Sequence, residues 1–152
     1  MPTDEVLFNA LKKDDGIYQL TTCSPSGEQD SMLSGSLVEL AWGEIDREPI
    51  IAKLASEEIK IISLTITEGG YKVDFNKSRS VFWYVAEGLK RRMEKDLPIT
   101  ILSCDNMQMN GNAARCAFMS YFEAKYPEVA AWAKKTNILE SQNTREIFLR
   151  KR

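Results

Sequence analysis

The chain has 152 residues, a formal net charge of −2 and no histidine. This length suits one domain with a real core, and the near-neutral charge favours neither nucleic acid nor an anionic membrane surface as a partner. The lack of histidine excludes Ser-His and Cys-His nucleophile pairs and every histidine-containing zinc site.

The first forty residues predict a helix followed by a β-hairpin. Residues 4–13 carry apolar side chains at helical spacing. Residues 17–23 are rich in β-branched and aromatic side chains and precede a Ser-Pro-Ser-Gly turn at 24–27. A second strand is expected between residues 30 and 40, with a bend at Gly35. The two strands would then pair antiparallel.

From residue 46 onward, helices and strands are expected to alternate. The predicted order is helix 46–55, strand 59–67, helix 79–95, strand 99–103 and helix 112–135. Pro127 predicts a kink or a division in the last helix. Alternation of this kind, with nearly continuous apolar strands, is typical of an α/β fold with a mostly parallel sheet and flanking helices.

Polar residues follow two of these strands. Thr67, Glu68 and Gly69-Gly70 end one apolar stretch, and Asp105-Asn106 ends the other. In open α/β sheets, the carboxyl ends of strands face the crevice where ligands bind, and glycines let a flat ligand approach the backbone. Both segments also fit a purely structural role in place of a ligand site: a tight turn with a cap at residues 67–70, and an Asx turn at residues 105–106.

Other motifs point to ordinary structural roles. The run 90–92 and Lys95 read as a solvated helix face. Three cysteines without a CxxC pair indicate reduced thiols, and Cys104 and Cys116 are expected to act as small core residues. No metal site is expected, and neither a P-loop nor a Gly-x-Gly-x-x-Gly motif occurs.

The sequence contains no apolar run as long as a membrane span. Residues 1–5 lack the basic start and the apolar stretch of a signal peptide. We therefore expect a cytoplasmic protein without a membrane partner.

Residues 64–71 (Leu-Thr-Ile-Thr-Glu-Gly-Gly-Tyr), residues 102–107 (Leu-Ser-Cys-Asp-Asn-Met) and Asn110-Gly111 together resemble the mannitol dehydrogenase family. This family comprises long-chain, metal-independent polyol dehydrogenases and includes fructuronate reductases. The likeness runs from about Leu11 to Lys135. Further matching stretches are 15–20, 34–36, 81–84 and 130–132.

The resemblance implies a Rossmann-type domain that binds NAD or NADP, and hydride transfer between the nicotinamide and a sugar alcohol or keto-sugar. It assigns Asn106 to the asparagine that hydrogen-bonds the reacting oxygen. It assigns Thr67, Glu68 and Gly69 to the cofactor-binding strand end on the nicotinamide side. An amide donor at Asn106 would steady the charge that develops on an alkoxide.

By the same resemblance, residues 1–135 would be an incomplete NAD(P)-binding domain that lacks the first βαβ unit and its glycine-rich turn, and residues 136–152 a divergent tail. The helical domain with the catalytic lysine is also expected to be missing. We therefore expect weak or absent cofactor binding and no activity of the chain alone, with a polyol or keto-sugar as substrate only when other segments complete the site. The alternative is a non-enzymatic module that forms a self-dimer or binds a complementary fragment, because a missing βαβ unit would leave a sheet edge uncovered.

Overall fold

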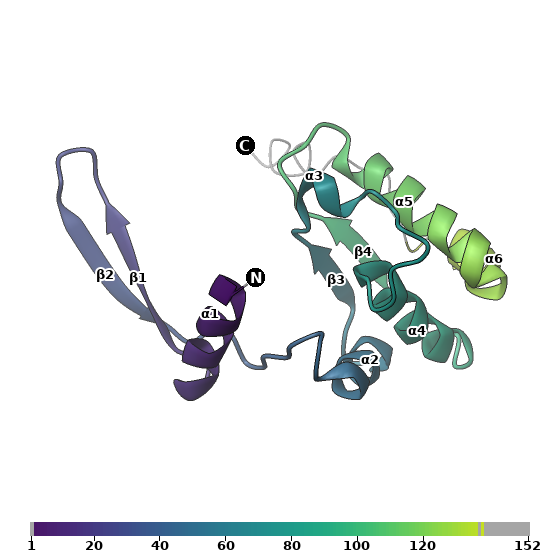
Figure 1. The fold of residues 1–152 in the computed structure, drawn as a ribbon, viewed down its shortest axis with the longest axis horizontal. Coiled ribbons are helices and arrows are strands. Elements are labelled where there is room, and N and C mark those ends of the chain that lie inside the picture. Colours follow the sequence, from purple (N-terminus) through teal and green to yellow (C-terminus); the bar gives the residue numbers. More distant parts are fainter. Residues whose placement is uncertain (1, 137, 139–152) are drawn as a thin grey trace. The chain divides into compact units, whose positions relative to one another are not determined.

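A computed structural model describes residues 2–136 and residue 138 (Figure 1). The chain divides into two compact units, Met1–Asp46 and Arg47–Arg152. Of the tail predicted for residues 136–152, only Thr136 and Ile138 are among the described residues.

The first unit contains the predicted helix and hairpin. Helix α1 covers Pro2–Lys13, and strands β1 (Tyr18–Cys23) and β2 (Gln29–Ser34) pair antiparallel. Their register places Tyr18 opposite Ser34 and Cys23 opposite Gln29. The tight turn between the strands is possible because Gly27 adopts a φ of +88°. The helix and the hairpin predicted from the sequence are confirmed.

The second unit has alternating helices and strands, in the order α2 (Arg47–Ala55), β3 (Ile61–Leu64), α3 (Thr67–Gly70), α4 (Val81–Met93), β4 (Thr100–Ser103), α5 (Asn110–Lys125) and α6 (Pro127–Thr136). Strands β3 and β4 are parallel neighbours, with Ile61 opposite Thr100 and Leu64 opposite Ser103. The predicted α/β class with a parallel strand pair and flanking helices is confirmed (Figure 1).

Strand β3 is shorter than the predicted strand 59–67. Its pairing ends at Leu64, and the backbone N–H groups of Ile66 and Thr67 bond to the Asp105 side chain. Thr67 also adopts a positive φ of 60°, which turns the chain out of the strand direction. Residues 67–70 then form the short helix α3, which the sequence analysis did not predict.

The predicted helix 112–135 is divided in two. Tyr126, with φ −142° and ψ 64°, separates α5 from α6, and Pro127 is the first residue of α6. Proline is favoured at this position because the first helical N–H has no partner within the helix. Beyond α6, the carbonyl of Ile138 accepts a hydrogen bond from the Ile101 N–H at 2.9 Å, so the described residue after the helix lies beside β4.

The core of the second unit lies between the strand pair and helices α4, α5 and α6. Phe118 and Phe122 are fully buried there, and the Phe118 ring meets the Phe82 ring edge-on at 4.8 Å. Gly88 allows α4 to pack closely on α2, because a Cβ at this position would lie 2.6 Å from the Cβ of Leu54.

Two expectations about individual residues are wrong. The run 90–92 is not a uniformly solvated face, because Arg92 is only 1% exposed. Cys104 and Cys116 are exposed rather than core residues. Along β4 the side chains alternate, with Ile101 and Ser103 buried, so that Cys104 points away from the core.

Candidate functional site

The candidate site lies at the carboxyl end of the parallel strand pair. Because β3 and β4 run in the same direction, the segments that follow them begin at the same edge of the sheet. Helix α3 follows β3, and residues 104–109 connect β4 to α5 (Figure 1).

The Asp105 carboxylate joins these two segments. Its Oδ1 accepts a hydrogen bond from the Thr67 N–H at 2.8 Å, and its Oδ2 accepts one from the Ile66 N–H at 3.3 Å. These bonds reach residues 38 and 39 positions away in the sequence. Asp105 therefore connects the two strand ends, which a local Asx turn would not do.

A tyrosine and a serine complete this network. The Tyr71 hydroxyl donates to Oδ2 of Asp105 at 2.5 Å and lies 2.7 Å from Oγ of Ser103. A phenol has one hydrogen to donate, so the Ser103 hydroxyl must donate to the Tyr71 oxygen. Tyr71 and Ser103 are 9% and 3% exposed. The part of the network formed by Tyr71 and Ser103 therefore lies inside the protein.

Asn110 lies at the end of the segment that connects β4 to α5 and hydrogen-bonds back to the start of that segment. Its side-chain amide donates to the carbonyls of Ser103 at 3.1 Å and of Asp105 at 2.9 Å. Asn110 and Gly111 belong to the first turn of α5, which begins two residues earlier than the predicted helix 112–135. The chain enters the helix through Met109, which has a positive φ of 51°.

The predicted site residues occupy the exposed side of this arrangement. Thr67, Glu68 and Gly69 lie on α3, Asn106 directly follows Asp105, and all four are exposed. The bond from the Thr67 N–H to Asp105 brings the segment of α3 next to the segment that carries Asn106.

The two glycines of this segment have different roles. A Cβ on Gly69 would have no atom within 4 Å, so the backbone there is open to a ligand. A Cβ on Gly70 would lie 2.9 Å from the Cβ of Ile66. Gly70 is therefore required for packing, and only Gly69 fits the prediction that a flat ligand can approach the backbone.

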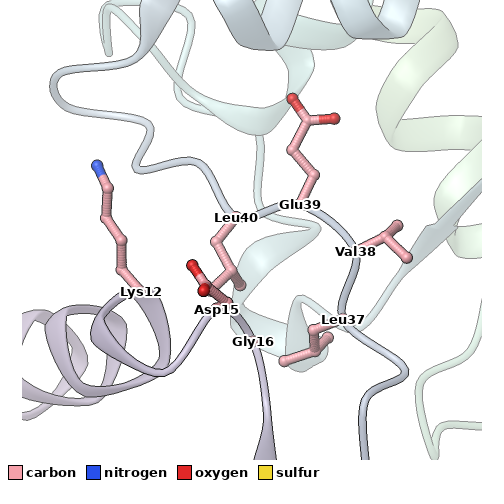
Figure 2. A pocket seen from close by; sticks show the side chains of 7 residues that line it. All are labelled: Lys12, Asp15, Gly16, Leu37, Val38, Glu39 and Leu40. Carbon is pink, nitrogen blue, oxygen red and sulfur yellow. The ribbon is translucent and has the colours of Figure 1, made fainter.

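Two hollows differ in their position relative to these residues. One, of about 290 Å³, is lined by Gly69, Gly70, Lys72, Asp74, Lys77, Arg79, Ser80, Val81 and Phe82. It combines the open backbone of Gly69 with basic side chains, which suits an anionic or polar ligand. The other, of about 190 Å³, lies in the first unit between residues 12–16 and 37–40 (Figure 2). None of the predicted site residues lines that second hollow.

Within the described residues, no three His, Cys, Asp or Glu side chains are placed to hold a metal ion. In the same part of the chain, no helix has the length and apolar character needed to cross a membrane.

Tyr71 should make stability depend on pH in the alkaline range. Burial, followed by donation to Asp105, raises the pKa of Tyr71 from 10.0 to about 12. The folded state keeps this proton to higher pH than the unfolded state, so the stabilisation is complete below pH 10 and is lost as pH rises toward 12. We expect the free energy of unfolding to fall above pH 10, and to fall less steeply in Tyr71→Phe.

Urea denaturation at several pH values between 8 and 11 would measure both slopes. Burial also raises the pKa of Tyr126, so the Tyr71→Phe variant should keep part of the decrease. Parallel slopes for the two proteins would contradict the assignment to Tyr71.

Sequence reasoning missed the roles of Tyr71, Ser103, Asp105 and Asn110. All four lie in or next to the two segments singled out from the sequence, but their partners are set by tertiary structure. A usable signal was present at Ser103, because a polar residue on the buried side of a strand needs a hydrogen-bond partner.

The sequence of the chain matches a known protein family. Residues 3–141 match the model of the mannitol dehydrogenase Rossmann domain. A polyol:NADP oxidoreductase of Gluconobacter oxydans is 35% identical over 145 residues, which cover 82% of this chain and 30% of that protein. A mannitol 2-dehydrogenase of Aspergillus clavatus is 33% identical over 153 residues, which cover 86% of this chain and 30% of that protein.

Two solved structures have the same fold over most of the chain. The substrate-free crystal structure of a D-sorbitol dehydrogenase aligns with a TM-score of 0.79 and 32% identity, covering 89% of this chain and 32% of that one. The Pseudomonas fluorescens mannitol 2-dehydrogenase in a ternary complex with NAD and D-mannitol aligns with a TM-score of 0.79 and 28% identity, covering 90% and 32%. This chain thus spans about a third of the length of the proteins that it matches.

Proposed function

The chain belongs to the mannitol dehydrogenase family, matching its Rossmann domain, and on this premise we propose that it forms the nicotinamide side of an NAD(P)-dependent oxidoreductase site. The reaction is hydride transfer between the nicotinamide and a sugar alcohol or keto-sugar, of the mannitol/fructose or hexuronate type. A solved relative in complex with NAD and D-mannitol supports this choice of cofactor and substrate class.

In this proposal, the side-chain amide of Asn106 donates a hydrogen bond to the reacting oxygen. A neutral donor at that position stabilises the negative charge that develops on the oxygen. Thr67, Glu68 and Gly69 line the nicotinamide, with the open backbone at Gly69 allowing the flat ring to approach. The cofactor, when bound, supplies the hydride chemistry.

One observation supports the proposal most strongly. The parallel pairing of β3 and β4, and the bond from the Thr67 N–H to Asp105, hold the segments of Thr67–Gly69 and Asn106 at one edge of the sheet. Ligands of open α/β sheets bind at this edge.

A calorimetric titration of the 152-residue chain with NADH tests the proposal. We expect saturable but weak binding, because none of its residues form a Gly-x-Gly-x-x-Gly turn for the cofactor pyrophosphate. Gly69→Val, which places a branched side chain in the open space above the backbone, should weaken binding further. Gly35→Val is the matched control, since a Cβ at Gly35 also has no atom within 4 Å.

Absence of saturable binding at millimolar NADH would contradict the proposed cofactor site. Micromolar affinity would instead contradict the expectation of weak binding by this chain.

A second candidate function is supported by exposed apolar side chains. In the hairpin, Leu20 and Met32 are opposite each other and are 49% and 60% exposed, and Leu33 is 75% exposed. On β3, Ile61 is 59% exposed. A two-stranded hairpin with open apolar side chains is favourable for binding a second copy or a complementary fragment.

The two candidates differ in a measurable way. Sedimentation analysis that finds a stable self-dimer, together with no NADH binding, would favour the non-enzymatic module. A monomer that binds NADH would favour the oxidoreductase site.

A further inference from the structure

We propose that Asp105 is a positioning residue of the nicotinamide site, and that its carboxylate sets the placement of Asn106 relative to Thr67–Gly69. The inference rests on the proposed function and extends it to a residue that contacts neither substrate nor cofactor. It depends on a juxtaposition in the structure: one half-buried carboxylate connects the two segments that carry the proposed site residues.

Asp105 is fixed from both of its sides. Its side chain accepts from the backbone of Ile66 and Thr67 and from the hydroxyl of Tyr71. Its main-chain carbonyl accepts from the side-chain amide of Asn110 at 2.9 Å. The next residue is Asn106, so the backbone from which the proposed oxygen-binding amide extends has little freedom to move.

Only a carboxylate satisfies all the donors around this position. Two backbone N–H groups and one hydroxyl point at its two oxygen atoms, and an ionised carboxylate offers acceptors at both. Asparagine has one oxygen, and its amide nitrogen would direct hydrogens toward another donor. Asp105→Asn should therefore separate the segments although the side chains have nearly the same shape.

Tyr71 makes the same inference testable with a milder change. Tyr71→Phe removes the hydroxyl that links Asp105 to the buried Ser103, while the aromatic ring stays in place. Tyr126→Phe is a matched control, because the Tyr126 hydroxyl also donates to a carboxylate, that of Glu87 at 2.7 Å. Neither Tyr126 nor Glu87 belongs to the proposed site.

The first measurement uses the ligand-free chain. In ¹H–¹⁵N correlation spectra, Asp105→Asn and Tyr71→Phe should shift the backbone amides of Thr67–Gly69 and also the side-chain amide of Asn106. Tyr126→Phe should leave both sets unchanged. If Asn106 keeps its signal while Thr67–Gly69 move, Asp105 does not couple the two segments and the inference is wrong.

The second measurement is the affinity of each folded variant for NADH. Loss of precise placement should weaken NADH binding about tenfold in Asp105→Asn and about threefold in Tyr71→Phe, while Tyr126→Phe stays within about twofold of the unmodified chain. Equal affinities in all four proteins would overturn the inference alone. No binding by the unmodified chain would overturn the proposed function and, with it, this extension.

Discussion

Arg92→Ala is expected to destabilise the second unit by about 3 kcal/mol. The Arg92 guanidinium donates to four main-chain carbonyls, those of Leu97 at 2.8 Å, Leu54 at 3.2 Å, Ser56 at 2.5 Å and Pro98 at 3.2 Å. It thereby holds together the connections that lead into β3 and β4. Alanine would leave these carbonyls without their donor and would open a cavity where the side chain is now only 1% exposed.

The neighbouring Arg91→Ala is the control. Arg91 forms a bidentate ion pair with Glu48, with N···O distances of 2.6 and 3.0 Å, but the two side chains are 42% and 68% exposed. Exposed pairs contribute less than about 1 kcal/mol. Urea denaturation followed by circular dichroism would measure both variants, and a comparable loss in the two would contradict the structural role assigned to Arg92.

Phe118→Ala is expected to cost about 4 kcal/mol, because it removes a large side chain from the centre of the core. Phe118 is 0% exposed and packs between the rings of Phe82 and Phe122, at centroid distances of 4.8 and 5.8 Å. Helix α5 follows the segment of the candidate site. Loosening this helix should therefore also reduce the order of residues 104–109.

Phe75→Ala makes the same chemical change at a ring that is 42% exposed and stacks on Tyr121. We expect this control to lose less than about 1.5 kcal/mol. The midpoint of thermal unfolding for each variant provides the test. Similar midpoints for Phe118→Ala and Phe75→Ala would show that the core does not depend on Phe118 as described.

Local patterns in the sequence were sufficient to predict most elements of the fold. The apolar spacing of residues 4–13, the turn at 24–27 and the division at Pro127 depend on neighbours a few positions away, and the structure agrees with each. The length of β3 was overestimated because its end is set by Asp105, a residue 41 positions beyond Leu64. A sequence pattern that spans a few neighbouring residues cannot reveal a partner so far along the chain.

The burial of Arg92 illustrates what a closer sequence analysis could recover. Val85, Leu89 and Arg92 follow one another at spacings of four and three residues, so they share one face of a helix. That face is apolar and buried, whereas Lys90 and Arg91 lie on other faces. The prediction treated the run 90–92 as one charged group. It therefore missed Arg92, which helical geometry directs into the core.

The position of the candidate site could be predicted from the sequence, but the hydrogen bonds that connect its parts could not. Strand ends of a parallel pair must meet at one edge, so the proximity of the segments of Thr67–Gly69 and Asn106 follows from the α/β pattern. That Asp105 would join them, with Tyr71 and Ser103 beneath, depends on distances that only the folded chain defines.

The proposed function requires that the segment after β3 and the segment after β4 bind one nicotinamide together. The most direct measurement is an NADH titration followed by ¹H–¹⁵N correlation spectra of the whole chain. We predict that the backbone amides of Thr67, Glu68 and Gly69 and the side-chain amide of Asn106 shift together and saturate at the same NADH concentration. Saturable shifts confined to other residues, such as those lining the hollow of residues 12–16 and 37–40, would contradict the claim.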